Sequence, residues 1–222
     1  MKLLNEIQEQ FEKIYRLPPL QPVQGFLIDE QTARRNHLHF DHSVSELLLI
    51  VEQPPETRIG LYISREVLER LEDSEPFQNL TSENLEDFCT AVEGVSHFLY
   101  FLIRSGQTRP VSPLELELQA EVDKFVLCTF MLEQQGGRRV SQALIISLFE
   151  NYHLIPSISL SEQERYQLAN RLAWQYCQSL KKFSRPIHRR QWVREIRRFH
   201  QKNLQEKIHL LTTQKGRVTL RE

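Results

Sequence analysis

The chain has 222 residues, of which 40% are hydrophobic and 26% are charged. This balance supplies enough apolar surface for a folded core and argues against a disordered chain, and the length fits one or two domains. Glycine is scarce, at 7 residues, which favours helices over the turn-rich strands of a β-sandwich or barrel.

The cysteines and the N-terminus predict a cytoplasmic protein. Cys89, Cys128 and Cys177 lie far apart and form no C-x-x-C pair, so they indicate neither a disulfide framework nor a thiolate metal site. The first residues lack the apolar stretch of a secretory signal, and no apolar run reaches the length of a membrane span. We therefore expect neither export nor a membrane partner.

The N-terminal part is predicted to combine a helix with a small β-hairpin. Apolar side chains recur at helical spacing over residues 3–16, so we expect an amphipathic helix that ends before Pro18. After a proline-rich connector, three segments have the composition of strands: residues 38–40, 46–52 and 58–63. Pro54 and Pro55 supply a turn between the last two, which predicts a hairpin.

From residue 64 onward the pattern is helical. We expect Ser64 to cap a short helix, and Thr81 or Ser82 to cap a long one over residues 83–104. Ser112, followed by a proline and then Glu115, has the pattern of a capped helix start. That helix is expected to end near the glycines at positions 136 and 137.

Three further helices are predicted in the C-terminal half. An apolar helix covers residues 140–152, and Ser161 with Glu164 forms the pattern of a capping box for a helix that ends near Phe183. A basic amphipathic helix follows over residues 188–211. Its apolar side chains Trp192, Ile196 and Phe199 share one stripe, which is typical of core packing.

The predicted fold class is mainly α (α+β), with a small N-terminal β-hairpin element packed on a bundle of five to six helices. We divide the chain into an N-terminal helix, a hairpin element, a helical body and a tail, namely residues 1–17, 18–75, 76–211 and 212–222. The alternative is one compact domain.

One short string resembles a known metal-binding motif. His37, His39, Asp41 and His42 form the pattern H-x-H-x-D-H. It resembles the motif of the metallo-β-lactamase superfamily, which implies zinc ligation by these side chains and generation of a hydroxide nucleophile. The resemblance covers six residues, and our preferred interpretation is a polar loop or an edge strand.

A second candidate site is a buried polar network. Glu121 lies on the apolar seam of the helix that Ser112 opens, where a carboxylate needs a partner. His97 lies on the preceding helix among apolar residues and also needs one. We predict a network of His97, Glu93, Glu117 and Glu121, which would be structural or would bind a metal or act as acid and base.

The charge is unevenly distributed along the chain. Residues 1–100 contain 8 lysines and arginines against 18 acidic residues, whereas residues 181–222 contain 13 against 3. The predicted basic patch consists of Arg189, Arg190, Arg194, Arg197 and Arg198. By helical spacing we place 190, 194 and 197 on one face and 189 and 198 elsewhere. Such a density attracts phosphates or an acidic protein surface.

No assembled catalytic set is visible in the sequence, so we favour a non-enzymatic function. We expect a protein-interaction or accessory module that binds a protein partner or another copy of itself, because a polarised charge distribution favours oriented association. A nucleic-acid-binding regulator that uses the basic helix is the alternative, and a metal-dependent hydrolase that uses the H-x-H-x-D-H string is the third hypothesis. Only the metal hypotheses call for a cofactor.

Overall fold

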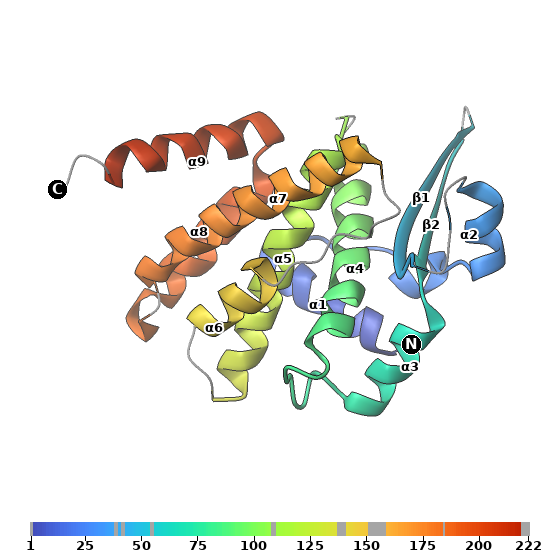
Figure 1. The fold of residues 1–222 in the computed structure, drawn as a ribbon, viewed down its shortest axis with the longest axis horizontal. Coiled ribbons are helices and arrows are strands. Elements are labelled where there is room, and N and C mark those ends of the chain that lie inside the picture. The colour runs from blue at the N-terminus through green and yellow to red at the C-terminus, as the bar shows by residue number, and fades with distance from the viewer. Residues whose placement is uncertain are drawn as a thin grey trace. The chain divides into compact units, whose positions relative to one another are not determined.

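The computed structural model describes residues 2–37, 40, 43–53, 56–107, 110–136, 141–150, 159–183 and 185–218. These residues are mainly helical, with an N-terminal two-stranded antiparallel hairpin packed on helices, which confirms the predicted fold class (Figure 1). They group into two compact units, Met1–Gln107 and Thr108–Glu222. The four-part division expected from the sequence stays a prediction.

The first unit is built around the long helix α4. Its helices and strands are α1 (Lys2–Tyr15), α2 (Glu30–Asn36), β1 (Glu46–Gln53), β2 (Glu56–Ile63), α3 (Arg65–Ser74) and α4 (Leu85–Ser105), with a 3-10 turn at Val23–Phe26. Helices α1 and α3 and both strands contact α4.

The predicted N-terminal helix is confirmed as α1. Leu4, Ile7 and Phe11 are almost fully buried, as expected for one apolar stripe that packs on α4. Arg16 follows the helix with a φ of 57°, a left-handed conformation that ends it.

The predicted hairpin is also confirmed. Strands β1 and β2 pair antiparallel from Glu46 opposite Ile63 to Gln53 opposite Glu56. The C-terminal end of β2 is buried, including Leu61, and β2 packs on α4. The strand expected at residues 38–40 is not formed at Phe40, and its first two residues lie outside the described part of the chain.

Helix α2 was not predicted. The Asp29 carboxylate caps it by accepting a hydrogen bond of 2.8 Å from the Thr32 amide, and its hydrogen bonds to Thr32 lower the pKa of Asp29. Ala33 is the one buried residue of this seven-residue helix. A helix this short has no repeating apolar stripe, so the periodicity gave no signal.

The two predicted caps in this region have different outcomes. Ser64 accepts a hydrogen bond from the Val67 amide, which confirms it as the cap of α3. The cap expected from Thr81 or Ser82 is wrong, because α4 begins after Asn84. The Asn84 side chain instead accepts a hydrogen bond of 2.9 Å from the Thr81 amide and so braces the preceding turn.

The second unit consists of helices that pack mainly through α5 and α7. Its elements are α5 (Pro113–Gln134), α6 (Gln142–Ile145), a π-helical turn (Ile146–Glu150), α7 (Leu160–Ser179), 3-10 turns at Leu180–Phe183 and Pro186–His188, α8 (Arg189–Gln201) and α9 (Leu204–Val218). Of the apolar helix expected over residues 140–152, the described part is a short α-helix that widens into a π turn, and residues 140, 151 and 152 lie outside the described residues.

One of the two predicted caps in this unit is confirmed and the other is displaced. Ser112 accepts a hydrogen bond from the Glu115 amide, as predicted. The capping box of α7 is formed by Ser159 and Glu162, two residues before the predicted pair. Both serines have a glutamate three residues later, so the pattern could not distinguish the two starts.

The prediction of one continuous helix over residues 188–211 is wrong. The helix breaks after α8, and Asn203 begins α9 by accepting a hydrogen bond of 2.9 Å from the Glu206 amide. The Glu206 carboxylate accepts one of the same length from the Asn203 amide. This reciprocal cap stabilises a new helix, which continues to Val218.

No helix among the described residues has the length and apolar character needed to cross a membrane.

Candidate functional site

The H-x-H-x-D-H string lies largely outside the residues that the structure describes, since His39, Asp41 and His42 are not among them. His37 is described, and it ends α2, where its amide donates to the carbonyl oxygen of Ala33. The structure therefore does not test whether the four side chains converge. The zinc ligation implied by the resemblance stays a prediction.

The predicted buried network falls on both units. His97 and Glu93 lie on α4, whereas Glu117 and Glu121 lie on α5. Within its own unit Glu121 pairs with the Lys124 ammonium at 2.9 Å, and Glu117 lies 3.8 Å from the guanidinium of Arg165. Both carboxylates are buried, so each cation offsets part of the cost of removing a charge from water.

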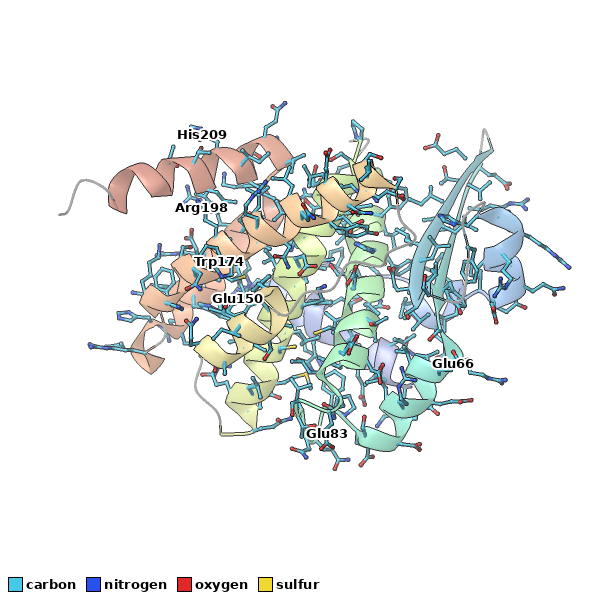
Figure 2. The ribbon with its side chains drawn as sticks, viewed as in Figure 1. Glu66, Glu83, Glu150, Trp174, Arg198 and His209 are labelled. Carbon is cyan, nitrogen blue, oxygen red and sulfur yellow. The ribbon has the colours of Figure 1, made fainter. Side chains whose placement is uncertain are left out.

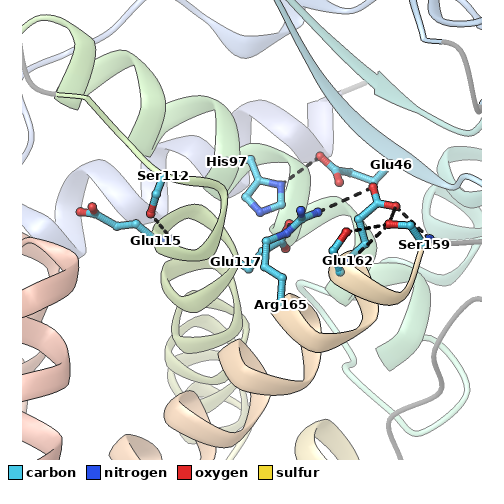
Figure 3. A network of polar contacts seen from close by, with 9 residues as sticks. Glu46, His97, Ser112, Glu115, Glu117, Ser159, Glu162 and Arg165 are labelled. Atoms are coloured by element: carbon cyan, nitrogen blue, oxygen red, sulfur yellow. Dashed lines mark hydrogen bonds and ion pairs between the residues drawn. The ribbon is translucent and has the colours of Figure 1, made fainter.

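In the first unit the structure adds a residue that the sequence analysis missed. The Glu46 carboxylate lies 3.3 Å from Nδ1 of His97, and Figure 3 shows the imidazole facing it. Glu93 completes the group, because one donor atom from each of Glu46, Glu93 and His97 lies within 4.8 Å of the other two. We call these three residues the Glu-Glu-His cluster.

The Glu-Glu-His cluster is formed by regular secondary structure. Glu46 begins β1, and Glu93 and His97 lie one turn apart on the same side of α4. The side chains of Glu46 and His97 are 13% and 8% exposed, so both are largely withdrawn from water. Donors held on a strand and a helix are positioned more firmly than donors on a loop.

Gly94 allows the strand and the helix to meet at this point. A Cβ atom built on Gly94 would lie 2.9 Å from Cγ of Glu46 and 3.1 Å from Cδ1 of Leu61. Glycine in a helix interior costs about 1 kcal/mol relative to alanine, so its presence needs a packing reason. Here the reason is the passage of the Glu46 side chain across α4.

The basic patch lies on α8, which has two distinct sides. Trp192, Ile196 and Phe199 are almost fully buried and fall within about 60° of one another around the helix axis. Phe199 stacks on Tyr176 of α7 with ring centroids 3.8 Å apart, and Trp192 meets Phe130 of α5. The stripe is core packing, as predicted, and these rings are not available to stack on bases.

The opposite side of α8 carries exposed arginines. Arg190, Arg194 and Arg198 are exposed, and their directions fall within about 80° of one another. We call these three residues the arginine stripe. Arg198 is labelled in Figure 2. Our placement of Arg198 away from the other two was wrong, because steps of four residues rotate only about 40°. Arg197 is half-buried, and Arg189 lies 6.0 Å from the ring centroid of Phe130.

A buried lysine in the second unit was also missed. Lys207 on α9 is fully buried, and its ammonium donates a hydrogen bond of 2.7 Å to the side chain of Gln119 on α5. Gln119 in turn donates to the Asp123 carboxylate at 2.8 Å. The ammonium also lies 5.1 Å from the Phe199 ring centroid. These contacts fix α9 on α5 and on α8, the helix that carries the arginine stripe.

The fold and these sites define a mainly helical protein with a β-hairpin, a basic helix and a Glu-Glu-His cluster. The chain matches no protein-family model, no curated protein and no solved structure. Function is therefore inferred from the residues of this chain.

Proposed function

We propose that the protein is a non-catalytic interaction module that binds an acidic protein surface through the arginine stripe of α8. The observation that carries this proposal is the separation of α8 into a buried aromatic side and an exposed cationic side. The buried side fixes the helix, so the three guanidinium groups project from a supported surface. Guanidinium groups form paired hydrogen bonds with carboxylates, which suits recognition of an acidic surface.

The charge of the two units supports oriented association. The first unit contains 9 lysines and arginines against 18 acidic residues, a net charge of −9, and the second contains 19 against 11, a net charge of +8. Complementary charge accelerates the encounter of two proteins and disfavours wrong partners. The first unit of a second copy of this chain is negatively charged, opposite to the arginine stripe, so self-association is one form of the proposal.

Binding of nucleic acid would use the same guanidinium groups, since phosphates attract them equally well. Two observations favour a protein. The aromatic rings of α8 are buried rather than presented for stacking, and single-stranded nucleic acid is usually bound with such rings. The chain as a whole has a net charge of −1, whereas nucleic-acid binders are commonly basic.

The test compares the full chain with the variant Arg190→Glu/Arg194→Glu/Arg198→Glu. Each protein is used to capture partners from native lysate with and without nuclease treatment, and bound protein and nucleic acid are both quantified. The purified chain is examined in parallel by sedimentation over a range of concentrations. Arg16, Arg58 and Arg65 are exposed and lie on the first unit, so changing all three to glutamate gives a control with the same change in charge.

We expect one dominant protein, or a second copy, whose affinity falls with salt and falls at least tenfold in the α8 variant but not in the control. Partner binding that is equal in all three proteins would contradict the proposal. Recovery of nucleic acid that depends on the arginine stripe would support the nucleic-acid function instead. A chain that remains a monomer and captures neither protein nor nucleic acid would overturn the proposal.

A further inference from the structure

We propose that the Glu-Glu-His cluster of the first unit binds a divalent transition-metal ion of the Zn²⁺ type. One imidazole nitrogen and two carboxylate oxygens form a mixed nitrogen and oxygen donor set. Such sets suit Zn²⁺ and its neighbours in the first transition row better than Ca²⁺ or Mg²⁺, which prefer oxygen alone. This inference does not depend on the proposed interaction function.

The separations between the donor atoms of the Glu-Glu-His cluster fit a metal centre once the cluster contracts slightly. Two ligands held at about 2.1 Å from a tetrahedral ion lie about 3.4 Å apart. Oε1 of Glu46 and Nδ1 of His97 are 3.3 Å apart, close to that separation. All three donor atoms lie within 4.8 Å of one another, so closing the cluster onto an ion requires a movement of at most about 1.4 Å, which a rotation of the half-buried Glu93 would supply.

The surrounding structure holds the donors at this spacing. Glu93 and His97 are fixed by the helix period, and Glu46 is held against α4 where Gly94 leaves room for its side chain. Two carboxylates brought together with low exposure repel each other, and a divalent cation relieves that repulsion. Three protein ligands leave at least one coordination position for water.

A protonated His97 that pairs with the two carboxylates is the competing state. The two states respond oppositely to acid, because metal ligation requires a neutral imidazole and the ion pair requires a protonated one. Metal binding by the cluster must therefore weaken as pH falls through the range where histidine titrates.

In the experiment the full chain is first freed of metal with a chelator and dialysed. It is then titrated with Zn²⁺ in a calorimeter. Co²⁺ serves as a second probe, because its visible absorption reports the number and geometry of its ligands. Thermal unfolding with and without Zn²⁺ gives a measurement that needs no variant. A ligand that binds the folded state raises the midpoint of unfolding.

The variants separate this site from other metal binding. Glu93→Gln replaces a charged donor by a weak neutral one and His97→Asn removes the imidazole nitrogens, each with little change of shape. Glu52→Gln, on the same strand as Glu46 and exposed, is the matched control. His37→Asn/His39→Asn removes imidazoles of the H-x-H-x-D-H string, which is a different candidate for the same ion. Circular dichroism of each variant establishes that it is folded.

We expect one Zn²⁺ per chain, a midpoint raised by several degrees and affinity that weakens at lower pH. Affinity should fall at least tenfold in Glu93→Gln and His97→Asn and stay unchanged in Glu52→Gln and in the double histidine variant. Binding that survives in the cluster variants but is lost in the double histidine variant would overturn the proposal. Absence of a calorimetric signal together with an unchanged unfolding midpoint would overturn it as well.

Discussion

Substitution of Gly94 by alanine is expected to destabilise the protein, contrary to the usual effect of this change in a helix. Alanine at an ordinary helix interior position stabilises by about 1 kcal/mol. At Gly94 the new methyl group would lie 2.9 Å from Cγ of Glu46, closer than carbon atoms pack. Overpacking of this kind costs about 1–3 kcal/mol, so the net effect is a loss of about 1 kcal/mol.

The assay is urea denaturation followed by far-ultraviolet circular dichroism. Gly106→Ala is the matched control, because Gly106 has right-handed backbone angles with φ at −62°, and its nearest atom would lie at 3.5 Å. That change should leave stability unaltered or raise it by about 0.4–1 kcal/mol. Helix α4 and its C-cap residue therefore supply two glycine substitutions of opposite expected sign.

A double-mutant cycle with Glu46→Ala tests the cause. When Cγ of Glu46 is absent, Gly94→Ala loses its shortest contact and keeps the one at 3.1 Å to Cδ1 of Leu61, so its cost should disappear. The coupling between the two changes is then about 1–2 kcal/mol, above the error of additivity for independent sites. A value near zero, or a Gly94→Ala protein as stable as Gly106→Ala, would refute the packing of Glu46 on α4 and the Glu-Glu-His cluster with it.

Three other outcomes follow from the second unit. Ser159→Ala should lower the free energy of unfolding by about 1 kcal/mol, whereas Ser161→Ala should change it by a few tenths at most, which chemical denaturation would resolve. Gln119→Leu removes the acceptor of the Lys207 ammonium and should cost about 1.5–3 kcal/mol, with faster hydrogen exchange in α9 as the local signature. Burial raises the pKa of the Cys177 thiol well above its usual range, so labelling by a thiol reagent near neutral pH should require unfolding; rapid labelling of the native chain would contradict its burial.

The features that the sequence predicted correctly are local. The apolar stripe of α1, the strand composition and proline turn of the hairpin, and the caps at Ser64 and Ser112 each depend on residues close together in the sequence. The displaced cap of α7 shows the limit of such patterns, because Ser159 and Ser161 both precede a suitable glutamate. Only the folded chain determines which serine takes the extended backbone of a cap.

The candidate sites were predicted only in part, because a sequence pattern links only residues that are close together along the chain. Glu93 and His97 are four residues apart on one helix, so their shared side follows from the helix period. Glu46 is 51 residues from His97, and Lys207 is 88 residues from Gln119, and no periodicity links residues at such distances. The one local signal was Gly94, a glycine inside a long helix, which indicates that another segment approaches closely there.

The arginine stripe and the Glu-Glu-His cluster belong to different units, so their consequences can be separated by experiment. Glu93→Gln alters a half-buried carboxylate of the acidic unit and leaves α8 untouched, and charge reversal on α8 leaves every donor of the cluster in place. If a partner is lost in the α8 variant alone, the cluster serves stability or a separate ligand. If Glu93→Gln also weakens the partner, the metal and the partner are energetically coupled, and linkage then requires that the partner change the affinity for Zn²⁺ by the same factor.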